Sequence, residues 1–205
     1  MAFISHTNKE IQFRIVYYGP ALCGKTTNLV YIHSRISPVY RGDLISLATA
    51  ADRTLFFDFL PIDSVVLHGF RTKFQLYTVP GQVLYNTTRQ LVLRNVDGVI
   101  FAADSQWDKM EQNVESFRNL EENLGQQNLA LDEVPYVLQF NKRDLPNIAP
   151  ANFLEYLLNN RKRRVQSFEA AASTGLNVFT TLDAVTQLLL HKFNRENRPL
   201  RPNSR

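Results

Sequence analysis

The sequence predicts an α/β protein in which helices cover both faces of a mostly parallel central sheet. Strand-like runs of β-branched and aromatic residues alternate along the chain with segments whose apolar residues recur every three or four positions. Several of these strand-like runs are continuously apolar, as expected for strands that are covered on both faces. A chain of 205 residues, 44% of them hydrophobic, can bury one substantial core but is short for two domains. We therefore expect one domain over residues 1–193 and a basic, disordered tail over 194–205.

The predicted elements follow one another in a regular order. The first strand covers residues 12–18, and a helix follows at once over 25–36. Further strands are expected at 55–60, 74–78, 98–103, 136–140 and 165–170. Two amphipathic helices follow later, with core-facing residues Met110, Val114, Phe117, Leu120 and Leu124 in one and Val178, Leu182, Val185, Leu189 and Phe193 in the other. In such a fold a ligand binds beyond the carboxyl ends of the strands.

Cysteine content and hydropathy restrict the class of protein. The single cysteine, Cys23, excludes an intramolecular disulfide framework, and no Cys/His cluster has zinc spacing. No apolar run approaches the roughly 20 residues that a membrane-spanning helix needs. The N-terminus lacks the pattern of a signal peptide, and neither end carries a lipidation motif. We expect a cytoplasmic protein without integral membrane association.

The positive charge is concentrated near the C-terminus. Residues 191–205 hold five of the Lys and Arg residues against one glutamate, and this excess equals the net charge of +4. A basic tail can attract an acidic partner, nucleic acid or anionic lipid. The tail lacks interleaved aromatics and contains Pro199 and Pro202, so we favour a solvated end and expect no nucleic acid partner. The RKRR run at 161–164 is interpreted as an exposed loop or helix end.

A phosphate-binding loop follows the first strand. Residues 19–26 read GPALCGKT and match the pattern GxxxxGK[ST], with the required strand before it and helix after it. In such a loop the backbone N–H groups point at phosphate oxygens, Lys25 reaches the β and γ phosphates, and Thr26 places its hydroxyl on Mg²⁺. The positive end of the helix dipole adds to this attraction. Cys23 is interpreted as a tolerated small residue, although a helix N-terminus can also activate a thiol.

A second motif selects the base. NKRD, residues 141–144, follows the apolar strand YVLQF, which places it at the carboxyl edge of the sheet beside the phosphate loop. The Asp144 carboxylate can accept both the ring N–H and the exocyclic amino group of guanine, an arrangement of donors that adenine lacks. A wrong base would leave this carboxylate unpaired. The two motifs together predict a guanine nucleotide.

With these motifs the chain resembles the Ras-like GTPases, and among them the bacterial MglA group of polarity and gliding-motility switches. The most specific segments are ISLATAADRTLFFDFLP (45–61), FQLYTVPGQV (74–83) and FNKRDLPN (140–147). The resemblance implies a Ras-type P-loop fold over residues 1–193 and a cycle between GTP and GDP. It also implies stimulation by a Roadblock-type MglB partner.

The resemblance assigns catalytic roles to two residues. Gln82, just after Pro80 and Gly81, would orient the attacking water, which agrees with what phosphoryl transfer requires. Arg53 would be an arginine finger supplied by the chain itself when MglB docks; from the residues alone it is a surface arginine. Thr78 stands where most Ras-like proteins have the aspartate of DxxG, as it does in MglA-like proteins, and it leaves the hydrolysis rate and Mg²⁺ affinity open.

The remaining predicted site residues contact the nucleotide or bind the metal. The segment EAAAS, 169–173, occupies the position of a base-binding loop that many relatives write SAK, with Ala172 at the alanine. Mg²⁺ would be held by Thr26 and Thr54. The expected nucleotide contacts are Gly19, Ala21, Leu22, Cys23, Gly24, Lys25, Thr26, Thr27, Thr54, Gly81, Asn141, Lys142, Asp144, Ala172 and Ser173.

Two other functions remain open from the sequence. Thr78 is compatible with a module that binds GTP and partners but scarcely hydrolyses GTP. A small-molecule P-loop kinase would leave NKRD unexplained. Binding of guanine against adenine nucleotides separates the kinase from the other two.

Overall fold

A computed structural model describes residues 2–49, 52–67, 69–82 and 85–197, and the side chains of 47–49, 52–56 and 65 lie outside that description. The strands are β1 (Phe3–Ser5), β2 (Glu10–Tyr18), β3 (Ile45–Thr49), β4 (Asp52–Leu67), β5 (Phe70–Thr78), β6 (Gly98–Asp104), β7 (Tyr136–Asn141) and β8 (Ser167–Glu169). The helices are α1 (Lys25–Arg35), α2 (Asn86–Leu93), α3 (Met110–Gly125), α4 (Ala151–Leu158) and α5 (Val178–Glu196), with short 3-10 turns η1 (Pro38–Tyr40), η3 (Trp107–Lys109) and η4 (Leu131–Glu133).

The sheet has the order β3-β4-β5-β2-β6-β7-β8, with β1 paired to β2 off this path. Strands β5, β2, β6, β7 and β8 run parallel, whereas β3 and β4 are antiparallel additions at one edge. The parallel part confirms the predicted α/β fold class. Because parallel strands end at the same edge, the loops after β2, β5, β7 and β8 meet there.

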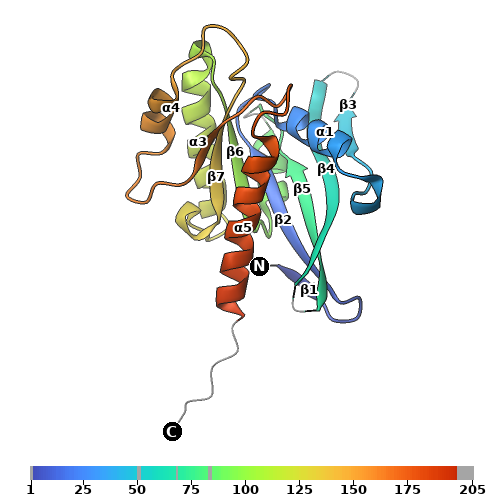
Figure 1. The fold of residues 1–205 in the computed structure, drawn as a ribbon. Coiled ribbons are helices and arrows are strands. Elements are labelled where there is room, and N and C mark those ends of the chain that lie inside the picture. Colours follow the sequence, from blue (N-terminus) through green and yellow to red (C-terminus); the bar gives the residue numbers. More distant parts are fainter. Residues whose placement is uncertain (1, 50–51, 68, 83–84, 198–205) are drawn as a thin grey trace.

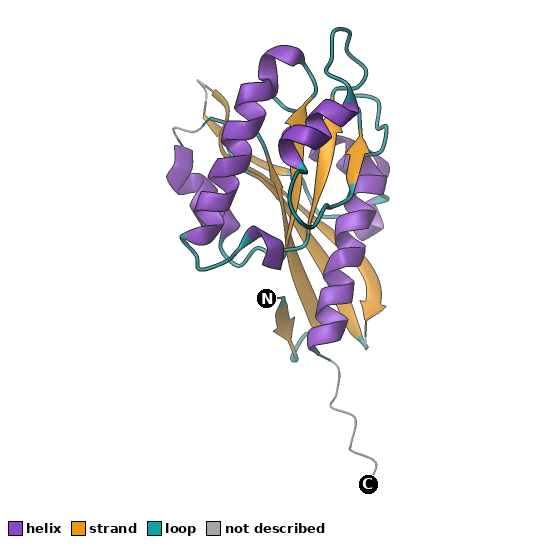
Figure 2. Cartoon of the chain, turned by 90° about the vertical axis from the view of Figure 1, so that its left-hand side faces the viewer, coloured by secondary structure: helices purple, strands orange, loops and turns teal. Residues whose placement is uncertain are grey.

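Helices cover both faces of this sheet, as Figures 1 and 2 show. On one face, α1 and α5 pack against the sheet and contribute Leu29, Ile32, Val185 and Leu189 to a core that includes Ile15 of β2. On the other face, α2, α3 and α4 form a second core, which includes Leu93, Phe117 and Leu154. The predicted stripe of the last helix is buried throughout. In the earlier stripe Phe117, Leu120 and Leu124 are buried, while Met110 and Val114 are partly buried.

The structure differs from the predicted elements mainly around residues 45–67. One 16-residue strand, β4, replaces the predicted strand at 55–60, and its antiparallel partner β3 was not predicted. Helices α2 and α4 were also missed, because each spans only eight residues, too few for a helical period to stand out. Helix α5 continues to Glu196, three residues past the predicted domain boundary, and the tail from 198 lies outside the described residues. Across the described chain, no helix has the length and apolar character of a membrane span.

Candidate functional site

The loop between β2 and α1 has the geometry of a phosphate cradle. Helix α1 begins at Lys25, and Gly24 stands before it with a left-handed backbone, φ 98°. A Cβ on Gly24 would lie 2.2 Å from Nδ2 of Asn141, so only glycine fits there. The first N–H groups of α1 have no side-chain cap, as expected where an anion is to accept from them.

Lys25 is a buried cation held only by neutral groups. Its side chain is 6% exposed, and Nζ donates to the carbonyls of Gly19 (3.0 Å) and Pro20 (2.7 Å). Among the described residues no carboxylate forms an ion pair with it. Burial lowers the pKa of its ammonium group, as does the positive charge of Arg89, whereas Cys23 and the more distant Asp58 carboxylate oppose this shift. A buried cation without a counter-ion is costly. The site therefore favours a negatively charged ligand beside Lys25.

Cys23 lies in the same loop and is fully buried. Burial raises the pKa of its thiol, an effect that the nearby Lys25 charge only partly opposes. A neutral, buried thiol is a poor nucleophile. This result agrees with the interpretation of Cys23 as a small packing residue rather than a reactive one.

Asn141 joins the phosphate loop to two further loops. Its Nδ2 donates to the carbonyl of Cys23 (2.7 Å), and its Oδ1 accepts from the N–H of Ala172 (2.9 Å). Asn141 itself ends β7 and is 2% exposed. One buried side chain thus links GPALCGKT, NKRD and EAAAS, which are far apart in the sequence.

The rest of NKRD is tied to the same region. Lys142 pairs with the fully buried Asp104 at the end of β6 (2.6 Å). Asp144 is exposed, and its Oδ2 accepts from the hydroxyl of Ser173 (2.7 Å). The predicted base residues therefore lie together, with the Asp144 carboxylate open to solvent.

A buried carboxylate that the sequence did not single out lies opposite the phosphate loop. Asp58 of β4 is 2% exposed, and its Oδ2 accepts from the hydroxyls of Thr26 (2.6 Å) and Thr78 (2.8 Å). Its Oδ1 accepts from Ser46 of β3 (2.6 Å). The backbone N–H of Asp58 donates to the Thr78 hydroxyl (2.8 Å). The only available signal was an aspartate between two phenylalanines in a β-rich run, FFDFL.

The structure describes some of the predicted switch residues fully and others only by their backbone. The backbone of Arg53 and Thr54 lies in β4, but their side chains fall outside the described residues, so their roles stay predictions. Gln82 is exposed, and its carbonyl accepts from the N–H of Tyr85 (3.2 Å). Gly81 lies against the phosphate loop: a Cβ there would be 2.2 Å from Cα of Ala21. Leu22 and Thr27 are exposed at the cradle.

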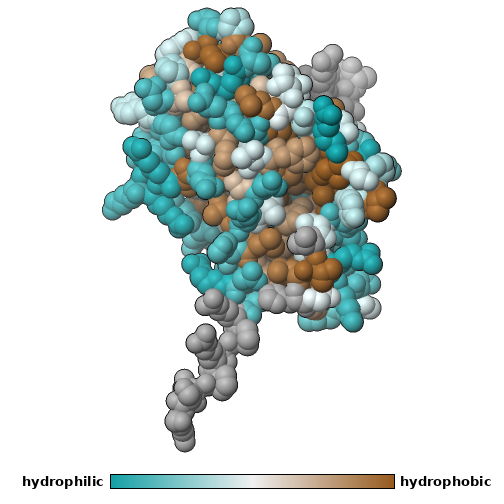
Figure 3. All heavy atoms as spheres, viewed as in Figure 1, coloured by the Kyte–Doolittle hydropathy of each residue, from teal (hydrophilic) through white to brown (hydrophobic). Residues whose placement is uncertain are grey.

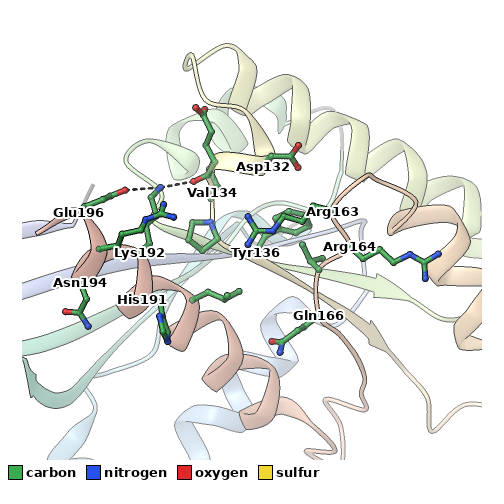
Figure 4. A pocket seen from close by; sticks show the side chains of 15 residues that line it. Asp132, Val134, Tyr136, Arg163, Arg164, Gln166, His191, Lys192, Asn194 and Glu196 are labelled. Carbon is green, nitrogen blue, oxygen red and sulfur yellow. Dashed lines mark hydrogen bonds and ion pairs between the residues drawn. The ribbon is translucent and has the colours of Figure 1, made fainter. Parts of the chain in front are cut away.

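A separate groove of about 1060 Å³ lies at the opposite end of the sheet. It is lined by the start of β7, the loop after α4 and the end of α5, where Lys192 donates to the carbonyl of Glu133 (2.7 Å), as Figure 4 shows. Arg163 and Arg164 line it and are exposed, so the exposed loop predicted for RKRR is confirmed at 162–164, whereas Arg161 is partly buried and pairs with Glu121. The groove is remote from the phosphate loop, because Tyr136 begins β7 and Asn141 ends it.

Apolar surface gathers at a different edge. Figure 3 shows brown surface on the side occupied by α1 and the segment that follows it, and a second brown area lower in the view, near β1. Val39, Tyr40 and Ile45, from η1 and the edge strand β3, are 78%, 59% and 48% exposed. This edge leads directly into the residues around Arg53.

The comparison with protein-family profiles finds no match. Over 195 residues the chain is 51% identical to "Mutual gliding-motility protein MglA" of Myxococcus xanthus (strain DK1622), and the alignment covers 95% of this chain and 99% of that protein.

Proposed function

Because the chain belongs to the MglA family of small Ras-like GTPases, we propose that it is a GTP/GDP switch that hydrolyses GTP in bacterial gliding motility or cell polarity. The observation that carries this proposal is the Asn141 side chain, which bonds the Cys23 carbonyl and the Ala172 N–H. This link holds the phosphate loop, the NKRD segment and the loop at Ala172 together at one edge of the sheet, which supports a single nucleotide site there.

The base would be recognised by groups on two loops. Asp144 accepts the ring N–H and exocyclic amino group of guanine in place of the Ser173 hydroxyl that it now accepts. The Ala172 N–H is already engaged with Asn141, whereas the Ser173 N–H meets no acceptor among the described residues. Ser173 is therefore our candidate donor to the guanine carbonyl, with Ala172 holding the loop in place.

The phosphates would complete a site that is short of negative charge. Lys25 turns from the Gly19 and Pro20 carbonyls toward the β and γ phosphates, and the open N–H groups of α1 bind the same oxygens. The buried ammonium then gains the counter-ion that it lacks.

The oxygen-rich cluster around Asp58 fits Mg²⁺. Magnesium prefers hard oxygen ligands and keeps several waters, so one hydroxyl, one nearby carboxylate and the phosphates suit it. Thr26 would be a direct ligand, and the Asp58 carboxylate would hold the hydration shell in the role that Thr78 cannot fill. Thr54 remains the second proposed ligand. When bound, Mg²⁺ neutralises charge on the β and γ phosphates.

Hydrolysis would depend on Gln82 and Arg53. Gln82 follows Gly81, which lies against the phosphate loop, and this place in the chain supports a role in orienting the attacking water. Arg53 would enter the site when a Roadblock-type MglB partner docks. The exposed apolar residues Val39, Tyr40 and Ile45 at the neighbouring edge support a partner surface there.

Two measurements test the proposal. Titration with guanine and adenine nucleotides should show binding of GTP and GDP only, and equal binding of ATP contradicts the base assignment. Single-turnover hydrolysis, with and without an MglB-type partner, should give a slow rate that the partner raises. Gln82→Ala should lower that rate while GTP affinity stays nearly unchanged, because orienting water matters mainly in the transition state. A protein that binds GTP but shows no turnover under either condition is an interaction module.

A further inference from the structure

Arg89 is a fully buried arginine that the proposed mechanism does not use. It lies in the middle of α2 and is 0% exposed, among the largest completely buried side chains of the described chain. Arginine is almost never fully buried unless it is paired. The groups that surround Arg89 should therefore explain why its side chain is buried.

The guanidinium is held by neutral acceptors. Nε donates to the carbonyl of Pro80 (2.8 Å), Nη2 to the carbonyl of Gly81 (2.5 Å) and Nη1 to Oδ1 of Asn119 (2.6 Å). Cζ lies 5.3 Å from the ring centroid of Tyr18, a cation–π distance. No carboxylate of the described residues lies within ion-pair distance of Arg89. All three nitrogens of the guanidinium thus donate a hydrogen bond, two of them to consecutive backbone carbonyls.

Those two carbonyls belong to the segment that leads into Gln82. On its other side Gly81 lies so close to Ala21 of the phosphate loop that an added Cβ would be 2.2 Å from its Cα. The backbone at Gly81 is therefore clamped between the phosphate loop and the guanidinium. Proline has no N–H, so Pro80 cannot anchor the segment through a donor of its own, and its carbonyl takes over.

On the side of Arg89 that faces away from Pro80 and Gly81, the interface between α2 and α3 is polar. Oδ1 of Asn119 on α3 also accepts from the Tyr18 hydroxyl (2.6 Å) and from Nδ2 of Asn123 (3.1 Å). Nδ2 of Asn123 donates in addition to Asn86 of α2 (2.8 Å). A network of directional bonds fixes a rotamer and orientation more sharply than apolar packing does. The bonds on the α3 side thus fix the orientation of the Arg89 guanidinium, and its bonds to Pro80 and Gly81 in turn fix the position of those two carbonyls.

We propose that Arg89 is a positioning residue for GTP hydrolysis: its fork fixes the Pro80–Gly81 backbone so that Gln82 can orient the attacking water. This inference rests on the proposed function and deepens it. Lysine cannot replace arginine in this role, because its single ammonium group lacks the planar fork that spans two consecutive carbonyls. The charge alone is insufficient.

The test compares three variants of the full chain. Arg89→Lys keeps the charge and loses the fork, Arg89→Gln keeps one planar donor group and loses the charge, and Gln90→Met is the matched control. Gln90 is the next residue of α2 and donates to Asn123 and Gln126 of α3 without contact to Pro80 or Gly81. For each variant, GDP and GTP affinities are measured by titration, hydrolysis by single turnover, and folding by thermal unfolding.

Both Arg89 variants should lower single-turnover hydrolysis about 100-fold, the size of effect expected from a misplacement of about 1 Å. GTP and GDP affinities should stay within about threefold of wild type, because ground-state contacts are made by other residues. Gln90→Met should hydrolyse GTP at close to the wild-type rate.

Three results overturn the role of Arg89: wild-type hydrolysis in Arg89→Lys, an equal loss in Gln90→Met, or a parallel loss of nucleotide affinity and hydrolysis, which marks mere structural support. If neither Arg89 variant folds, Asn119→Ser replaces them, since it leaves Arg89 in place but removes the acceptor of Nη1. A drop of about tenfold at unchanged affinity then supports the proposal, and a rate equal to that of Gln90→Met overturns it. Failure of the wild-type protein to bind or hydrolyse GTP overturns the proposed function instead.

Discussion

Replacing Asp58 by asparagine tests whether this chain obtains its metal-supporting carboxylate from β4. The Asp58 carboxylate accepts three side-chain hydroxyl bonds, with both threonines on Oδ2 and Ser46 on Oδ1. An asparagine has nearly the same shape but only one oxygen, so the hydroxyl donors on one of the two carboxylate oxygens lose their acceptor. The remaining bonds are then made to a neutral amide instead of a charged carboxylate. Hydrogen bonds to charged groups contribute about 1.5–3 kcal/mol each. The free energy of unfolding should therefore fall by at least the roughly 1.5–3 kcal/mol of one such bond.

The larger consequence concerns Mg²⁺. Loss of a side chain that supports a metal from its outer shell typically weakens metal binding about 10- to 100-fold. The Mg²⁺ concentration needed for half-maximal retention of bound GDP should rise by that factor in Asp58→Asn. The assay follows release of a fluorescent GDP analogue over a series of free Mg²⁺ concentrations.

The matched control is Asp63→Asn, a carboxylate further along the same strand that lies opposite Lys73 of β5, away from the phosphate loop. It should leave the Mg²⁺ dependence unchanged. If folded Asp58→Asn retains GDP with the wild-type Mg²⁺ dependence, then Asp58 merely ties β3, β4 and β5 together, and the metal argument is wrong.

Three further substitutions test the other parts of the site. Lys25→Ala should abolish binding of GTP and GDP, because it removes the buried cation that faces the phosphates; a nucleotide titration on folded variant checks this, and unchanged affinity removes the phosphate assignment. Asp144→Asn should shift preference from guanine toward xanthine nucleotides, since the new amide can donate to the xanthine carbonyl; competition between GTP and XTP measures it, and a retained preference for GTP contradicts it. Arg53→Ala should leave the slow rate of the isolated protein within a few-fold but lower partner-stimulated turnover about 10³- to 10⁵-fold. If the partner binds Arg53→Ala normally and still stimulates its turnover, Arg53 is a surface residue without a catalytic role.

The phosphate loop and NKRD were predictable because each is a short contiguous pattern. Their chemistry depends on residues only a few positions apart, and the strand before each motif sends both to the same edge of a parallel sheet. The core faces of α3 and α5 were predictable for a similar reason, since a helical period of apolar residues is a local property. The resemblance to MglA-like proteins, which the identity over nearly the whole chain supports, likewise rested on contiguous segments, at 45–61, 74–83 and 140–147.

Short elements were not predictable in this way. Helix α2 spans eight residues and carries a buried arginine on its inner face, so its sequence does not show an apolar stripe. Its position is set by the bonds of Arg89 to Pro80, Gly81 and Asn119 of α3, together with the packing of Leu93 in the second core. Tertiary contacts outweighed local propensity there.

The amino-acid sequence alone thus predicted the fold class, which the structure confirms, and it supplied the predictions of a phosphate loop and of guanine as the base. Only the tertiary structure brought Asp58 to Thr26 and Thr78: the antiparallel register of β4 and β5 sets Asp58 beside Thr78, and the packing of α1 on the sheet brings Thr26 to the same carboxylate. Only the tertiary structure aimed the Arg89 fork at two carbonyls, because its acceptors come from a loop and a neighbouring helix. Residues far apart in sequence, such as Arg89 and Asn119, carry no local period or spacing that relates them, and packing alone sets their distance.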